Sequence, residues 1–122
     1  MATILIVDDA LDSAEMLAWL FRRTGYETRV AGDGLQALDA LETGPPVDLV
    51  ILDLNMPEMD GIGFLRAMRD SATPTPPVVL LTASCDPEAI AEATRLGARR
   101  YFLKADFKLK DLREYVAQQV EH

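Results

Sequence analysis

The sequence predicts an α/β fold built on a parallel sheet, and two observations support this. Short β-branched or leucine-rich runs alternate with segments of helical periodicity, which is typical of parallel strands joined by helices. The runs at 4–7, 47–52 and 78–81 are almost continuously apolar, which indicates strands buried on both faces. We therefore predict a doubly wound five-stranded parallel sheet with five helices, in which the first, third and fourth strands are central.

The individual elements follow from these runs and from the breakers between them. The predicted strands are residues 3–7, 27–31, 47–52, 78–81 and 100–103. A first helical stripe covers 10–24 and stops at Gly25, and a second helix covers 34–43 and stops at a Gly-Pro-Pro breaker. The other helices are 62–69, one that begins with the N-cap pattern Asp86-Pro87-Glu88, and 109–120.

Composition bounds the class of protein. A chain of 122 residues with 49% hydrophobic and 26% charged residues fits one folded domain, which we expect to span 1–122. The net charge of -8 argues against a nucleic-acid-binding surface, because phosphate backbones require clustered cations. One cysteine, Cys85, cannot form an internal disulfide, and no stretch resembles a signal peptide or reaches bilayer length. We expect a cytoplasmic protein that does not enter a membrane.

Charged and polar side chains follow four of the predicted strands. Asp8 and Asp9 come after the first strand, Asp53 after the third, Thr82 after the fourth and Lys104 after the fifth. Because parallel sheets bind ligands outside the carboxyl ends of their strands, we expect these groups to converge at one edge. Each alone has a simpler explanation, such as a helix-capping turn or a polar strand end, but that explanation does not account for the set.

The chemistry of this set indicates a metal site. Three neighbouring carboxylates repel one another, and a hard divalent cation such as Mg2+ or Mn2+, bound through oxygen, relieves the repulsion. With part of the charge neutralised, one carboxylate oxygen of the three can attack a phosphoryl group. The metal and Lys104 then balance the charge of the phosphoryl oxygens.

These residues lie in segments that resemble a known family. The segments are Ile4-Leu5-Ile6-Val7-Asp8-Asp9, Leu52-Asp53-Leu54-Asn55-Met56-Pro57-Glu58-Met59-Asp60-Gly61, Leu81-Thr82-Ala83 and Phe102-Leu103-Lys104. With them the chain resembles the receiver domain of two-component response regulators, and is similar to its single-domain, chemotaxis-type members. The resemblance covers essentially the whole chain and implies the flavodoxin-like receiver fold with strand order 2-1-3-4-5.

The resemblance also implies a role for each site residue. Asp53 is expected to accept the phosphoryl group, and Asp9 and Asp53 to coordinate Mg2+ directly, together with the backbone carbonyl of Asn55. Asp8 is expected to act through a bound water. The resemblance thus describes a signalling switch whose only chemistry is phosphotransfer to its own aspartate and hydrolysis from it, rather than a turnover enzyme.

Further residues match the parts of the family that sense and time the signal. Thr82 is expected to donate a hydrogen bond to a phosphoryl oxygen and Lys104 to pair with the phosphoryl charge. Tyr101 matches the switch aromatic, whose ring turns inward as Thr82 moves; the alternative is an ordinary strand-face aromatic. Asn55 and Ser84 occupy positions that flank the attacking water and tune the lifetime of the phosphorylated form.

The resemblance implies partners as well. The expected donor is a sensor histidine kinase or a phosphotransfer protein, and a downstream protein, or a second copy in a homodimer, is expected on the fourth helix, fifth strand and fifth helix. Seven of the 12 basic residues lie between Arg95 and Arg113. Such a basic face would suit an acidic partner surface, and a solvated mixed surface is an equal alternative. Trp19 is expected to be partly exposed, either at a donor contact or flat over its neighbours.

The chain departs from the family pattern at one place, and two other functions compete with the receiver interpretation. The family usually has proline after the lysine, in a cis peptide, but here Ala105 follows Lys104 and we predict a trans bond. A haloacid-dehalogenase-type phosphohydrolase also uses a strand-end aspartate with Mg2+, but it needs a second acid where this chain has Asn55. A degenerate receiver that serves only as a scaffold is disfavoured by the complete set of acids, hydroxyl and ammonium.

Overall fold

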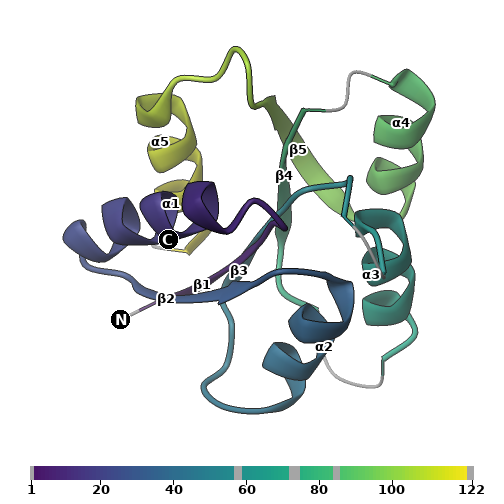
Figure 1. Ribbon diagram of the computed structural model, residues 1–122, viewed down its shortest axis with the longest axis horizontal. Coiled ribbons are helices and arrows are strands. Elements are labelled where there is room, and N and C mark those ends of the chain that lie inside the picture. Colours follow the sequence, from purple (N-terminus) through teal and green to yellow (C-terminus); the bar gives the residue numbers. More distant parts are fainter. Residues whose placement is uncertain (1, 57–58, 72–74, 84–85, 121–122) are drawn as a thin grey trace.

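Strands and helices alternate along the whole described chain (Figure 1). The computed structural model describes residues 2–56, 59–71, 75–83 and 86–120. The elements in chain order are β1 (Thr3–Val7), α1 (Leu11–Arg23), β2 (Glu27–Ala31), α2 (Gly34–Glu42), β3 (Leu49–Leu52), α3 (Gly61–Arg69), β4 (Val78–Thr82), α4 (Pro87–Arg95), β5 (Ala98–Leu103) and α5 (Leu109–Val120).

All five strands form one parallel sheet in the order β2-β1-β3-β4-β5. The prediction of a doubly wound sheet with β1, β3 and β4 in the centre is therefore confirmed. Val7 pairs with both Ala31 and Leu52, so β1, β2 and β3 end level. Leu52 pairs with Leu80, and β4 continues from there to Thr82. This register brings the residues that follow the strands to one edge of the sheet.

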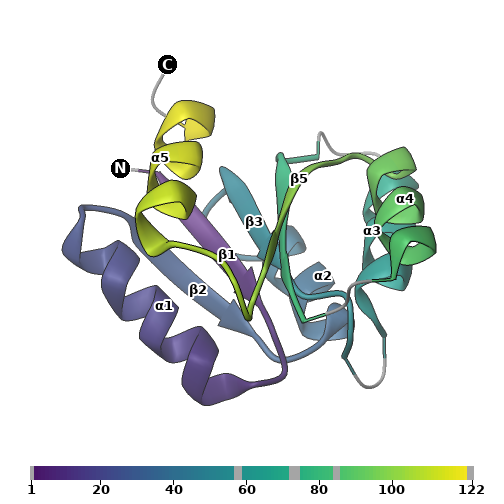
Figure 2. The same cartoon turned by 90° about the horizontal axis from the view of Figure 1, so that it is seen from above.

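The two faces of the sheet carry separate apolar cores, because successive strand residues point to opposite faces. Leu5, Val7, Val50, Leu52 and Leu80 face the layer of α2, α3 and α4. The alternate residues of the same strands face α1 and α5 on the other side, where they pack with Phe21, Leu112 and Val116. Figure 2 shows the two helical layers on either side of the sheet. Burial on both faces explains why the central strands are continuously apolar.

Element boundaries differ from prediction by one or two residues at several places. β3 begins at Leu49 rather than at residue 47, because Asp48 is exposed and its carboxylate accepts a hydrogen bond of 2.8 Å from the backbone N–H of Thr3. β5 begins at Ala98 rather than at residue 100. Ala98 pairs with Val78 and the next pair is Arg100 with Val79, so Arg99 forms an irregularity in the ladder.

Aspartate N-caps begin the three helices of one layer. The carboxylates of Asp33, Asp60 and Asp86 accept hydrogen bonds from backbone N–H groups in the first turns of α2, α3 and α4. The predicted start of α4 at Asp86 and Pro87 is thus confirmed, whereas the other two caps were not predicted. None of the helices in the described residues could cross a membrane.

Gly61 lets α3 approach the loop that follows β3. A Cβ atom on Gly61 would lie 2.7 Å from both the carbonyl oxygen of Asp53 and the Cα of Leu54. These are backbone atoms, which cannot rotate away. The Gly61 N–H donates to the carbonyl of Leu54 at 3.1 Å, so this contact also holds the backbone around Asp53 in place.

We expect Gly61→Ala to lower the free energy of unfolding by about 1 to 3 kcal/mol, because the methyl group would force backbone apart. Gly63→Ala is the matched control, since it lies in the same helix and its added methyl would meet mainly the flexible Met59 side chain, at 3.1 Å. The control should be neutral or stabilising, because alanine favours a helix over glycine by about 1 kcal/mol. Urea unfolding of both variants measures the difference, and equal stabilities would contradict the steric argument.

Candidate functional site

Two buried aspartates lie side by side where β1 and β3 end. Asp8 and Asp53 are 6% and 5% exposed. The N–H of Asp53 donates to the carbonyl of Val7 at 2.9 Å, and that of Asp8 to the carbonyl of Ala31 at 3.0 Å. The hydrogen-bond ladder of the sheet therefore continues past the strands and holds both aspartates in position.

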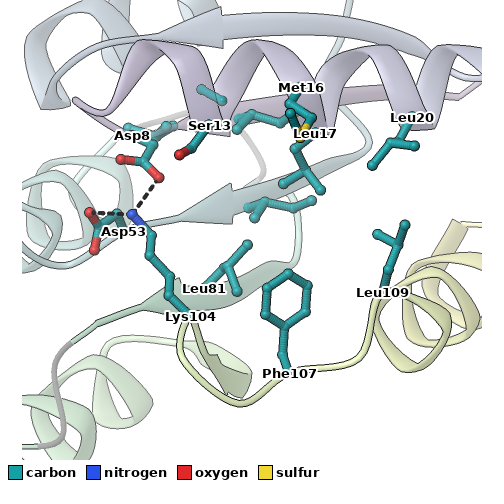
Figure 3. Close-up of a pocket in the computed structure, with 14 residues that line it drawn as sticks. Asp8, Ser13, Met16, Leu17, Leu20, Asp53, Leu81, Lys104, Phe107 and Leu109 are labelled. Carbon is teal, nitrogen blue, oxygen red and sulfur yellow. Dashed lines mark hydrogen bonds and ion pairs between the residues drawn. The ribbon is translucent and has the colours of Figure 1, made fainter.

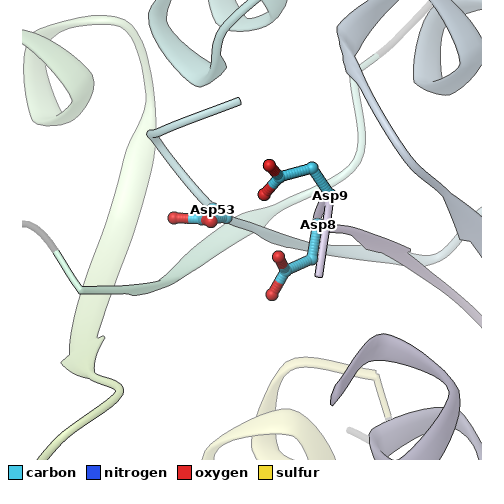
Figure 4. A group of neighbouring side chains, drawn as sticks. All are labelled: Asp8, Asp9 and Asp53. Carbon is cyan, nitrogen blue, oxygen red and sulfur yellow. The ribbon is translucent and has the colours of Figure 1, made fainter. Parts of the chain in front are cut away.

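Asp9 completes an acidic cluster with these two residues. Oxygen atoms of Asp8, Asp9 and Asp53 all lie within 4.8 Å of one another, and the three carboxylates point to the same side (Figure 4). Asp9 is exposed, so the cluster opens to solvent on its side. Oxygen donors of this kind, brought from two strand ends to one point, fit a hard divalent cation such as Mg2+.

Asn55 lies in the loop between β3 and α3, two residues after Asp53. Its backbone N–H donates to Oδ1 of Asp53 at 3.3 Å, so the chain turns back toward the acid two residues after it. The role of the Asn55 backbone carbonyl as a metal ligand stays a prediction. Pro57 of the Met-Pro pair and the next residue, Glu58, lie outside the described residues, whereas the Asp-Gly pair forms the N-cap and first residue of α3.

Lys104 supplies the positive charge of the site (Figure 3). Its Nζ lies 2.7 Å from Oδ2 of Asp8 and 3.3 Å from Oδ2 of Asp53. Burial of the ammonium by itself lowers its pKa, but the hydrogen bond to Asp8 and the charges of Asp53 and Asp8 outweigh burial. The pKa of Lys104 is therefore raised above its ordinary value, and its ammonium stays charged at neutral pH.

The bond between Lys104 and Ala105 is trans, as predicted, since the described residues contain no cis peptide bond. The N–H of Lys104 donates to the carbonyl of Thr82 at 2.9 Å, which carries the ladder of β4 and β5 up to the site. The side chain thus reaches both carboxylates even without the proline that the family usually has at this place.

The remaining predicted residues lie at different distances from this centre. Thr82 is fully buried at the end of β4 and is joined to Lys104 through the backbone. Tyr101 is 48% exposed on β5, where it pairs with Leu80. Ser84 and Cys85 lie outside the described residues.

Two features of the site were not predicted. The ion pair between Lys104 and Asp8 is shorter than that with Asp53, although Lys104 was expected to pair with the phosphoryl group at Asp53. In addition, a cavity of about 280 Å3 lies beside the acids, between α1 and the loop before α5. The helical periodicity of α1 placed Ser13, Leu17 and Leu20 on one stripe, but only the tertiary structure shows that they border a cavity.

Solved structures similar to this chain share its fold along nearly their entire length. A putative response regulator from Chloroflexus aurantiacus superposes with a TM-score of 0.86 at 34% identity, over 99% of this chain and 98% of that one. The response regulator TrrA from Thermotoga maritima, solved in complex with Mg2+ and BeF, superposes with a TM-score of 0.82 at 31% identity, over 98% and 99% of the two chains.

Sequence comparisons agree with the structural ones. The DNA-binding response regulator MtrA of Mycobacterium tuberculosis is 44% identical over 110 residues, which cover 89% of this chain and 46% of MtrA. The chain therefore spans about half the length of that relative. Sporulation initiation phosphotransferase F of Bacillus subtilis is 39% identical over 113 residues, 93% of this chain and 89% of the relative. The model of the response regulator receiver domain matches residues 4–117, and the chain belongs to this family of two-component signalling domains.

Proposed function

We propose that this receiver domain is a phosphorylation-dependent switch in which Asp53 accepts a phosphoryl group from a phosphohistidine donor. The observation that carries the proposal is the position of Asp53, which is buried at the carboxyl edge of the sheet with the Lys104 ammonium at 3.3 Å and two further carboxylates beside it. We take the donor to be a sensor histidine kinase or a phosphotransfer protein. The relative called a phosphotransferase supports this choice by its name.

The acidic cluster fits the divalent metal that the family uses. In the proposal Asp9 and Asp53 hold Mg2+ directly with the carbonyl of Asn55, and Asp8 acts through a water. The contacts of Asp8 support this division, because its two oxygens already accept hydrogen bonds from Lys104 and from the backbone N–H of Ala10 at 2.9 Å. When bound, the metal offsets the negative charge of the acids and of the phosphoryl oxygens.

The residues of the chain perform the transfer by position and charge. The N–P bond to the donor imidazole breaks as an O–P bond to a carboxylate oxygen of Asp53 forms, and the imidazole leaves with the electron pair. The Lys104 ammonium pairs with the phosphoryl oxygens, and the Thr82 hydroxyl donates a hydrogen bond to one of them. Hydrolysis later returns the carboxylate, with Asn55 and Ser84 beside the attacking water.

Readout is proposed to pass through α4, β5 and α5. Tyr101 is exposed here and would turn inward as Thr82 moves toward the phosphoryl group. Basic side chains lie on the same strand: the Arg100 guanidinium lies 4.6 Å from the centre of the Phe102 ring, and Arg99 donates a hydrogen bond of 2.9 Å to Gln119. Such a surface suits an acidic partner protein, or a second copy of the chain, better than it suits neutral surfaces.

Other surfaces bear on the remaining partners. Trp19 on α1 is half-exposed, as predicted, and the Arg23 guanidinium lies 4.8 Å from the centre of its ring, so the indole is packed against a neighbour while it remains accessible to a donor. We expect no direct nucleic-acid contact by this part, given the net charge of -8. The relatives named DNA-binding regulators are about twice as long, so their names do not test that expectation.

We expect the wild-type protein to gain one phosphoryl group per chain when it is incubated with acetyl phosphate and Mg2+. Asp53→Ala should gain none, because the accepting oxygen is removed. Asp39→Ala, which removes an exposed acid on α2, serves as the matched control and should behave like wild type. Intact mass measurement under conditions that preserve acyl phosphates reports the result. A wild-type protein that stays unmodified would contradict the switch and favour a scaffold.

A second prediction concerns stability at high pH. Because the pKa of Lys104 is raised in the folded state above its ordinary value of 10.5, the folded state binds the proton more tightly than the unfolded state. This stabilisation is fully present below 10.5 and is lost as pH rises through the folded-state pKa.

Lys104→Met supplies the comparison for this prediction, because it keeps most of the side-chain volume and cannot titrate. In metal-free buffer, the difference in free energy of unfolding between wild type and Lys104→Met should stay constant from about pH 7 to 9 and shrink above 10.5. Chemical denaturation across this range measures it. A difference that grows with alkaline pH would contradict the raised pKa.

A further inference from the structure

The cavity beside the acidic cluster has one polar end and a longer apolar body (Figure 3). Asp8, Asp53 and Lys104 border the polar end. The apolar part lies between α1 and the loop that leads into α5, with Leu17 and Leu20 on one side and Phe107 and Leu109 on the other. Ile6, Ile51 and Leu81, which point from the sheet toward α1 and α5, border it as well.

This cavity has the composition of a ligand site. Small-molecule sites are mostly apolar and contain a few polar groups that set orientation. Here the polar groups are buried at fixed positions, since Asp8 and Asp53 are held by the sheet ladder. The volume of about 280 Å3 has room for roughly nine water-sized groups, at about 30 Å3 each, so the ligand must be small.

The cavity is accessible along α1. Met16 is 66% exposed, Ser13 is exposed, and Leu20 is only partly buried, yet all three border the cavity. A small molecule could therefore enter between α1 and the loop before α5 without separating the helix from the sheet. The side chains at this entrance are flexible or small.

Charge selects the head group of the ligand. The polar end holds two carboxylates and one ammonium, and Asp9 adds another carboxylate within 4.8 Å. The end is thus net negative even with Lys104 charged. A cationic head can donate hydrogen bonds to carboxylate oxygens, whereas an anionic head would meet like charge and a neutral head would gain less.

We propose that this cavity binds a small amphiphilic cation: a primary ammonium group at Asp8 and Asp53, with an apolar body of about eight carbon atoms between α1 and the loop before α5. The ammonium shares the carboxylate oxygens with Lys104. The apolar body covers Leu17, Leu20 and Phe107 and removes their surface from water.

Binding of such a ligand opposes binding of the metal. This consequence depends on the proposed function, because it assumes that Mg2+ uses the same carboxylates. The three carboxylates outweigh the Lys104 ammonium by two charges, so a monovalent cation is attracted to the metal-free site. Mg2+ would cancel that remaining charge and occupy the same oxygens, so the ligand and the metal compete. By reciprocity, a ligand whose affinity falls when Mg2+ is present must in turn weaken the binding of Mg2+. The cavity would therefore let an amphiphilic cation reduce the phosphoryl acceptance proposed for Asp53.

The test uses four probes that separate head from body: n-octylamine, n-octanol, n-octanoate and n-butylamine, each kept below its aggregation concentration. Calorimetry and amide NMR shifts on the metal-free protein report binding and its place. Octylamine is expected to bind about tenfold more tightly than octanol, which corresponds to the free energy of one charge-assisted hydrogen bond. Octanoate and butylamine are expected to bind more weakly than octanol. Shifts should appear in α1, around Phe107 and near Asp8.

Variants assign the binding to the cavity. Ser13→Trp places a large side chain at the entrance and should abolish octylamine binding, whereas Glu15→Trp, in the same helix and also exposed but not bordering the cavity, should leave it unchanged. Asp8→Asn should remove most of the preference for octylamine over octanol. Melting temperatures of the three variants show that each remains folded.

The outcomes are decisive in both directions. Equal binding of octylamine and octanol, or binding that survives Ser13→Trp, would overturn the proposed site. Loss of affinity in excess Mg2+ supports the competition, and unchanged affinity contradicts it. A protein that binds octylamine as expected but fails to accept phosphate would sink the proposed function and leave the cavity site intact, so the two failures are distinguishable.

Discussion

Two buried carboxylates and one ammonium meet at the carboxyl edge of the sheet, and the arrangement around them depends on this contact. Asp8 and Asp53 would repel each other in a region shielded from water. Lys104 offsets that repulsion by donating to both, at 2.7 and 3.3 Å. The backbone ladder, which continues past β1, β3 and β5, prevents the acids from moving apart. The fold thus places carboxylates that could bind a metal beside an ammonium that could pair with a phosphoryl group.

The two helical layers serve this centre differently. α2, α3 and α4 begin at aspartate caps on the same edge as the acids, and Gly34 and Gly61 bring α2 and α3 close to the loop after β3. That layer therefore supports the backbone around Asp53. On the other face, α1 packs through small residues such as Ala14 and Ala18, and a cavity lies between α1 and the loop before α5. One layer positions the site, and the other leaves room beside it.

Basic and acidic residues are unevenly distributed along this acidic chain. The net charge is -8, but most of the basic residues lie in the last third of the chain. The Arg100 guanidinium lies over the rings of Phe102 and Tyr115, at 4.6 and 5.4 Å from their centres, and Arg99 donates a hydrogen bond to Gln119. These contacts hold both guanidinium groups in defined positions. The irregular pairing at Arg99 exposes both arginines together.

The sequence by itself determined the fold class, the central strands and the identity of the acids, because apolar periodicity and the residues after each strand are local properties. It did not determine that β3 starts at Leu49, since the hydrogen bond from Thr3 to Asp48 joins residues 45 positions apart. Only the tertiary structure decided that Lys104 lies closer to Asp8 than to Asp53, and that α1 borders a cavity. Both depend on packing between distant elements, which no local pattern encodes.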